Sequence, residues 1–166
     1  MRIREFRAHR ALLRFVPRTW GDLLGQLRDR GQGVRESGAF LLATGTADRR
    51  VERLVLYDEL DSTCLVGGID FHREGYQRLW DVCEREHLLV IGDVHTHPSS
   101  HTGQSGIDRG HPMLSRAGHV ALIVPNYAEG EVASQEVGVH HYQGTDGWRS
   151  YHGRLAARYL YIGRWA

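Results

Sequence analysis

Four side chains at fixed spacing constrain this chain more than any other feature of its sequence. They are His95, His97, Ser105 and Asp108, which form the pattern His-x-His-x7-Ser-x2-Asp. The apolar run 88–91 predicts a buried strand that carries both histidines at its C-terminal end. Residues two apart on a strand point to the same side, so both imidazoles can reach one ion. Pro98 then ends the strand pairing.

The serine and the aspartate follow a small polar loop. Ser105 is expected to start a short helix that runs to about Ser115. Ser105 and Asp108 are three residues apart and therefore share one face of that helix. A strand end and a helix start then direct three ligands and a hydroxyl group into one pocket.

Three protein ligands indicate a catalytic rather than a structural metal site. Structural zinc sites are closed by four protein ligands, whereas catalytic sites keep one position open for water. Bound zinc lowers the pKa of a water molecule to about 7 and polarises a carbonyl oxygen. A general base is still required, and a carboxylate is the usual choice.

The full spacing is far more specific than its parts. With 11 histidines in 166 residues, His-x-His is expected by chance about 0.7 times. The serine and aspartate at their offsets lower that expectation to about 0.002.

The pattern resembles the motif of the JAMM (MPN-plus, or JAB-domain) zinc metalloproteases, over roughly residues 34–127. In that family a glutamate precedes an apolar strand, and here Glu36 stands directly before the run 37–42. Gly92 ahead of the His-Thr-His-Pro stretch and the apolar strand 120–125 after it also resemble the family. Known members cleave peptide or isopeptide bonds after the C-terminal glycine of ubiquitin or a ubiquitin-like protein.

The resemblance implies a role for each residue of the motif. His95, His97 and Asp108 would bind one catalytic zinc ion. Glu36 would be the base that activates the attacking water and later passes a proton to the leaving amine. Ser105 would donate a hydrogen bond to the oxyanion of the tetrahedral intermediate, which is typically worth about 3 kcal/mol.

Two positions depart from the family pattern. Ala39 stands where many members have glycine, and Gln104 stands where many have proline before the motif serine. Neither removes a ligand, but Gln104 leaves the shape of the loop open. Glu52 and Glu59 are rival carboxylates that fit a surface role better, since neither directly precedes an apolar strand in the same way.

Other histidines and acids near the motif have alternative interpretations. His101 and His111 are candidates for outer or alternative ligands, but a solvated position is the simpler interpretation. Asp93 faces the same way as His95 if the strand alternates, so it either orients an imidazole or is a plain polar strand residue. Cys83 is expected in the core and Cys64 has no indicated role; two cysteines make no disulfide framework.

Composition excludes several classes of protein. Hydrophobic residues make up 41% of the chain, charged residues 25%, and the formal charge is +1, so neither a nucleic-acid binder nor a membrane protein is indicated. The charged segment 1–7 lacks the apolar core of a signal peptide, so a cytoplasmic location is expected. All 21 basic residues are arginine. This reflects either protection from lysine-targeted conjugation or, as the simpler explanation, arginine-rich codon usage.

Periodicity predicts one alternating α/β domain over residues 1–166. Two helices are expected, one from an N-cap at Thr19 to about Arg30 and one at about 73–86 after a break at Gly67-Gly68. The apolar stripe of the first is Trp20, Leu23, Leu24 and Leu27, and that of the second is Tyr76, Leu79, Trp80 and Cys83. Strands are expected at 11–15, 38–43, 51–57, 88–97, 119–124, 137–143, 148–152 and, as a packed tail, 159–165. The resemblance implies an MPN (JAB)-type fold: a mixed, mostly antiparallel, curved sheet flanked by two main helices, with a short helix carrying the serine and aspartate.

Other His-x-His families fit less well. Amidohydrolase barrels need about 200 more residues after the pair, and the metallo-β-lactamase pattern fails because residues 99 and 100 are serines.

The leading functional hypothesis is a zinc-dependent isopeptidase that removes or processes a ubiquitin-like protein. A small bacterial enzyme of a conjugation operon, such as a Bil-type antiphage operon, is the candidate context. Its partners would be ubiquitin-like conjugates together with the cognate activating and conjugating enzymes. The glycine-rich tail is expected to add as a strand beside the active-site edge. The alternatives are processing of a sulfur-carrier protein with a C-terminal Gly-Gly, and a non-catalytic MPN scaffold.

Overall fold

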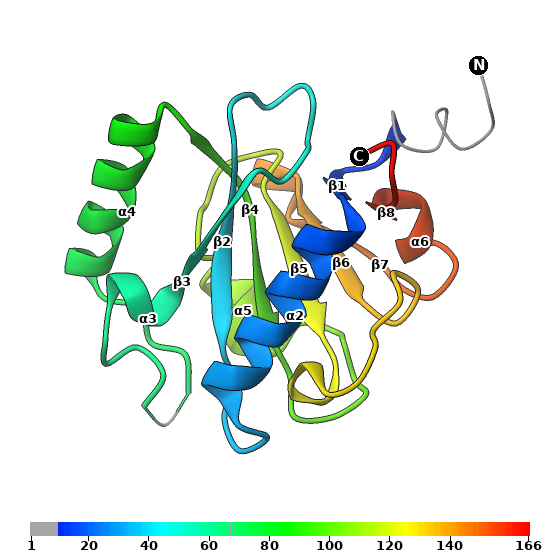
Figure 1. The fold of residues 1–166 in the computed structure, drawn as a ribbon, viewed down its shortest axis with the longest axis horizontal. Coiled ribbons are helices and arrows are strands. Elements are labelled where there is room, and N and C mark those ends of the chain that lie inside the picture. Colours follow the sequence, from blue (N-terminus) through cyan, green and yellow to red (C-terminus); the bar gives the residue numbers. More distant parts are fainter. Residues whose placement is uncertain (1–9, 67) are drawn as a thin grey trace.

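A mixed sheet organises the chain. The computed structural model describes residues 10–66 and 68–166; the charged segment 1–7 and Gly67 of the expected chain break lie outside the described residues. Within the described part, six strands form one sheet in the order β3-β2-β4-β5-β6-β7 (Figure 1). The strands are β2 (Gly38–Ala43), β3 (Arg53–Leu56), β4 (Leu89–Thr96), β5 (Val120–Val124), β6 (Gly138–Tyr142) and β7 (Trp148–Tyr151).

The sheet is mostly antiparallel, as the family resemblance implied. β4 pairs antiparallel with β2 and parallel with β5, while the remaining pairs are antiparallel. The register between β2 and β4 shifts between Leu41 and Leu42. β4, which carries the histidines, therefore lies in the middle of the sheet with a partner on each side.

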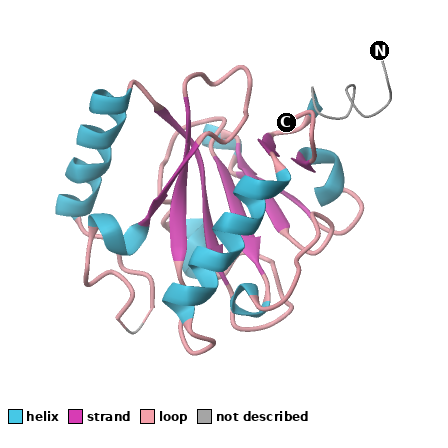
Figure 2. Cartoon of the chain, viewed as in Figure 1, coloured by secondary structure: helices cyan, strands magenta, loops and turns pink. Residues whose placement is uncertain are grey.

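The two faces of the sheet carry separate apolar clusters. In β2, Leu41 belongs to the cluster under helix α2 (Pro17–Gly31), whereas Phe40 and Leu42 belong to the cluster under α4 (Arg73–Glu86). This alternation is the two-residue period of a strand buried on both faces. Figure 2 shows α2 crossing in front of the strands, with α4 standing beside the β3 end of the layer.

Helix α2 confirms the predicted stripe but not the predicted start. Its buried side chains are Trp20, Leu23, Leu24 and Leu27. The N-cap is Val16 rather than Thr19, because Pro17 occupies the first helical position, where its missing N–H costs no hydrogen bond. The helix ends at a left-handed Gln32, with φ 51°.

Helix α4 has the predicted bounds, but the prediction of its buried apolar stripe is partly wrong. Leu79 is fully buried, whereas Trp80 is 47% exposed. The helix flanks one end of the sheet, so only a narrow side of it meets the apolar cluster.

Several predicted boundaries differ from the structure. The strand expected at 51–57 is shorter because Val51 donates its N–H to the carbonyl of Arg14, and Tyr57 begins a short helix, α3 (Tyr57–Leu60). The helix expected to reach Ser115 is only α5 (Gly106–Gly110). Pro112 explains its end, since the residue before a proline avoids the helical conformation.

The expected tail strand is present. β8 (Leu160–Ile162) follows a short helix, α6 (Ala156–Tyr159), and pairs parallel with β1 (Leu13–Phe15). These two strands form a small sheet of their own.

Two 3-10 turns, η1 (Asn126–Ala128) and η2 (Gly144–Asp146), complete the elements. Among the described helices, none combines the length and apolar character needed to cross a membrane.

Gly92 permits the close parallel approach of β4 and β5. A Cβ atom at this position would lie 2.4 Å from the carbonyl oxygen of Val120, a backbone atom that cannot easily move. We expect Gly92→Ala to lower the free energy of unfolding by about 1–3 kcal/mol, measured by urea denaturation. Gly25→Ala is the matched control: nothing lies within 4 Å of that Cβ, so it should stabilise helix α2 by about 0.5–1 kcal/mol. Equal effects of the two substitutions would contradict this account.

Candidate metal centre

The structure brings together the three predicted ligands. His95 lies on β4 and His97 directly after it, both nearly buried, while Asp108 lies on α5. The Nε2 atoms of His95 and His97 are 3.2 Å apart. Asp108 Oδ1 is 3.5 Å from His95 Nε2, and Asp108 Oδ2 is 3.6 Å from His97 Nε2. Within the described residues, these three form the one group of histidine, cysteine or acidic side chains that is close enough to hold a metal ion.

These separations fit a tetrahedral ion. Zinc–ligand bonds of about 2.0–2.2 Å at tetrahedral angles place neighbouring ligand atoms about 3.3–3.6 Å apart. The Nε2–Nε2 separation and the two separations from Nε2 to oxygen, one to each oxygen of Asp108, lie at or close to this range. Two imidazole nitrogens and one carboxylate oxygen are a donor set typical of zinc, with one position left for water.

The tautomer of His97 is set by its backbone neighbour. His97 Nδ1 lies 3.0 Å from the carbonyl oxygen of His101, which can only accept a hydrogen bond. The ring therefore donates from Nδ1 and keeps the lone pair of Nε2 for an ion. His101 thus contributes its carbonyl group and not, as considered from the sequence, its imidazole.

The main chain of His97 is also fixed. Its N–H donates to the carbonyl oxygen of Val124, and its carbonyl oxygen accepts from the N–H of Tyr127. Asn126, Tyr127 and Ala128 all have left-handed backbones, with φ from 52° to 61°, a conformation that costs non-glycine residues roughly 1–2 kcal/mol each. Arg28 of α2 holds this turn by donating to the carbonyl oxygens of Ala128 and Gly130 at 2.9 Å.

Ser105 and Asp108 form a capping box at the start of α5. Asp108 N–H donates to Ser105 Oγ at 3.1 Å, and Ser105 N–H donates to Asp108 Oδ2 at 2.7 Å. The same interaction begins the helix and orients the carboxylate. Because Ser105 Oγ accepts here, its own proton remains available for donation.

Glu36 is placed by its neighbour Ser37. The buried Ser37 donates its N–H to Thr96 Oγ1 at 3.0 Å and accepts from Thr96 N–H at 2.9 Å. Ser37 Oγ also donates to the carbonyl oxygen of Leu27 in α2 at 2.7 Å. These bonds fix the start of β2 against the end of β4, between the two histidines, and so fix the backbone of Glu36 beside them.

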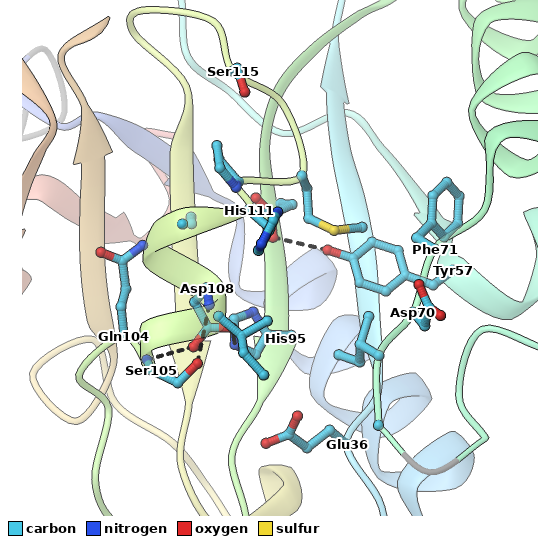
Figure 3. A pocket seen from close by; sticks show the side chains of 18 of the residues that line it. Glu36, Tyr57, Asp70, Phe71, His95, Gln104, Ser105, Asp108, His111 and Ser115 are labelled. Atoms are coloured by element: carbon cyan, nitrogen blue, oxygen red, sulfur yellow. Dashed lines mark hydrogen bonds and ion pairs between the residues drawn. The ribbon is translucent and has the colours of Figure 1, made fainter. Parts of the chain in front are cut away.

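One cavity of about 920 Å³ contains this site. Glu36, His95, Ser105 and Asp108 lie together at one end of it (Figure 3). Its other walls include residues 68–71, Tyr76 of α4 and, in the segment after α5, Met113. The Glu36 carboxylate, the Ser105 hydroxyl group and two of the three proposed ligands, His95 and Asp108, thus face a space large enough for a peptide segment.

The electrostatics of the site follow from the placement of Asp108. Burial alone would raise the pKa of the Asp108 carboxyl, but its interactions with His97, His95 and Ser105 outweigh burial and hold that pKa well below its usual range. Asp108 raises the pKa of His97, and the His101 carbonyl adds to this, although burial acts in the opposite direction.

Asp93 faces the cavity, as strand alternation predicted, but it orients neither ligand. Its carboxylate lies 2.6 Å from His119 Nε2 and accepts from Tyr57 Oη at 2.9 Å. All three side chains are buried. No sequence pattern indicated this cluster, because its members come from three separate parts of the chain.

The remaining candidates lie away from the ligands. Glu52 accepts from Thr44, and Glu59 pairs with Arg30, so neither rivals Glu36. His111 is exposed and lines the cavity. Cys64 and Cys83 are free thiols in the α4 cluster, and burial raises the pKa of both.

The loop that contains Gln104 is held without a proline. Thr102 within it is nearly buried, and its carbonyl accepts from His140 Nε2 at 2.9 Å. Ala39, the other departure from the family pattern, is fully buried in the α2 cluster.

Comparison with known proteins supports the fold. No model of a known protein family matches the chain. A JAB1/MPN domain protein from Archaeoglobus fulgidus is similar in structure, with a TM-score of 0.50, 13% identity, and coverage of 90% of this chain and 95% of that one.

Two proteins known from solution structures are also similar. One from Desulfitobacterium hafniense has a TM-score of 0.61 and 16% identity, covering 90% of this chain and 92% of its own. One from Salinibacter ruber has a TM-score of 0.53 and 20% identity, and the match covers 84% of this chain and 88% of that one. The chain therefore has the MPN/JAB-type fold that the sequence predicted.

The pairing of His97 with Asp108 predicts a pH-dependent stability of the metal-free protein. The raised pKa of His97 stabilises the folded state below its unfolded pKa of about 6.5, and this contribution is lost as the pH rises through the folded pKa. We expect the difference in unfolding free energy between wild type and Asp108→Asn to shrink as the pH rises above about 6.5. Urea denaturation in the presence of a chelator measures it, and a difference that does not change with pH would contradict the pairing.

Proposed function

We propose that this chain is a zinc-dependent peptidase or isopeptidase that hydrolyses the bond after the C-terminal glycine of a ubiquitin-like protein. The observation that carries the proposal is the grouping of His95, His97 and Asp108 beside a cavity that Glu36 and Ser105 also line. The two histidine Nε2 atoms lie 3.2 Å apart, and each lies 3.5–3.6 Å from one oxygen of the Asp108 carboxylate. The resemblance of the motif to the JAMM metalloproteases and the MPN/JAB-type fold support the class of reaction.

Each residue of the site has a chemical task in this proposal. A bound zinc ion would supply Lewis acidity, lowering the pKa of a water and polarising the scissile carbonyl. Glu36 takes the proton of the attacking water and transfers it to the departing amine. The Ser105 hydroxyl, whose proton is not used in the capping box, donates to the oxyanion that develops on the carbonyl.

The position of β4 modifies the expected mode of binding. β4 has β2 and β5 on its two sides, and the open edges of the described six-stranded sheet are β3 and β7. A glycine-rich tail therefore cannot extend this sheet at the strand that carries the histidines. It would instead lie in the cavity between residues 68–71 and the segment after α5, with its glycines beside Glu36.

The broader context stays part of the proposal. A bacterial conjugation system, including a Bil-type antiphage operon, would provide the ubiquitin-like conjugates together with activating and conjugating enzymes. Cleavage of a sulfur-carrier fusion but not of a modifier–protein conjugate would favour the alternative substrate. A wild-type chain that folds without binding zinc would favour the non-catalytic scaffold.

Glu36→Ala is expected to retain the fold and the zinc and to lower the rate of cleavage by at least about 100-fold, because the base is lost. The assay follows hydrolysis of ubiquitin-like fusions that end in Gly-Gly, with zinc content measured by mass spectrometry. Glu59→Ala is the matched control, since Glu59 lies at Arg30, away from the ligands. Full activity in Glu36→Ala would remove this residue from the mechanism.

Ser105→Ala tests the second catalytic group. We expect kcat to fall by about 100-fold at saturating zinc, together with a loss of about 1 kcal/mol in stability from the missing helix cap. Ser105→Thr keeps both the hydroxyl and the cap, and should recover most of both losses. If kcat in the alanine variant falls only as far as its zinc content does, Ser105 acts as a cap alone.

A further inference from the structure

A buried histidine on β6 contacts the loop that joins the two halves of the metal site. His140 is fully buried, and its Nε2 lies 2.9 Å from the carbonyl oxygen of Thr102. Its Nδ1 lies 2.8 Å from Ser150 Oγ on the neighbouring strand β7. The motif residues gave no reason to expect this contact.

The direction of both hydrogen bonds is fixed. A carbonyl oxygen can only accept, so His140 Nε2 carries the proton that it donates to Thr102. Burial lowers the pKa of His140 to about 4, so the ring is neutral near pH 7 and its Nδ1 accepts from the Ser150 hydroxyl. The ring thus acts as a fixed donor to Thr102.

The loop is held at two consecutive carbonyl groups by two imidazoles. His97, a proposed ligand, donates to the carbonyl of His101 at 3.0 Å, and His140 donates to the next carbonyl, that of Thr102. Three residues later Ser105 caps α5 and orients Asp108. The position of Asp108 relative to His97 therefore depends on where these two bonds hold the loop.

The backbone of β6 leaves the loop little alternative. A Cβ atom on Gly138 would lie 2.0 Å from the carbonyl oxygen of Thr102 and 2.8 Å from His140 Nε2. Only glycine at position 138 allows the loop to reach the sheet at this point. His152 adds a second contact from the Thr102 side chain, with His152 Nδ1 3.5 Å from Thr102 Oγ1.

We propose that His140 is a positioning residue for the metal site: by holding the Thr102 carbonyl, it sets the distance between the histidine ligands on β4 and Asp108 on α5. The inference rests on the proposed function, because it assumes that these three residues bind zinc. It assigns to His140 no contact with the ion or with the substrate.

Two amide variants separate this role from simple core packing. In His140→Gln the side-chain amide can reach the position of Nε2 and donate to Thr102. In His140→Asn the amide is shorter by one methylene group and reaches only the position of Nδ1. Both variants place a polar amide in the same buried site, so they differ chiefly in the bond to Thr102.

The measurement is the zinc affinity of the purified chain, by competition with a chromophoric chelator, alongside the melting temperature of the metal-free protein. We expect His140→Asn to bind zinc about tenfold more weakly than wild type and His140→Gln to bind with nearly wild-type affinity. His141→Asn, on the same strand but bonded to Gln143, is the matched control and should leave the affinity unchanged.

Gly138→Ala tests the same contact without altering a histidine, and it carries the test if His140→Asn does not fold. Its methyl group must displace Thr102, so we expect weaker zinc binding here as well. Wild-type affinity in folded His140→Asn or folded Gly138→Ala would overturn the positioning role, even if their melting temperatures fall. A wild-type chain that binds no zinc would overturn the proposed function and this inference with it.

Discussion

The parallel pairing of β4 with β5 is the constraint on which the site depends. Two adjacent parallel strands cannot be joined by a tight turn, so the chain must leave the C-terminal end of β4 and return to the start of β5. The crossover occupies residues 97–119 and contains the loop, helix α5 and the return segment. The histidines stand where the crossover begins and Asp108 stands within it. The proposed ligands, which are distant along the chain, therefore meet because the topology brings the crossover back over the sheet.

The hydrogen bonds around His97 show how a side chain at the start of this crossover is held in place. Its main chain bonds to β5 and to the left-handed turn η1, its ring bonds to the loop, and Arg28 ties the turn to helix α2. Three consecutive non-glycine residues in a left-handed conformation persist only where the surroundings determine them strongly. The strain is located directly behind a proposed ligand, where rigidity has the greatest value for holding an ion.

Local patterns predicted the parts of this molecule that local geometry determines. The grouping of the proposed ligands follows from strand alternation at His95 and His97 and from a helical cap at Ser105. The four residues of the apolar stripe of α2 were all predicted correctly. The stripe of α4 failed at Trp80, because periodicity does not reveal how much of a helix meets the sheet. Contacts such as Asp93 with His119, or His140 with Thr102, join elements far apart in sequence and follow no period. The error at Thr19 has a local cause instead: Pro17, two residues earlier, occupies the first helical position and sets the helix start.

The pairing of β1 with β8 has a consequence for the order in which the chain folds. Leu13 and Phe15 are fully buried, yet their partner strand ends at Ile162, so this small sheet cannot close until the chain has been synthesised as far as Ile162. Strands β2, β4 and β5, which frame the proposed metal centre, lie within residues 38–124 and are synthesised earlier. Contacts between distant segments are the slow ones to form. The central strands can therefore pair during synthesis, while the N-terminal strand waits for its partner.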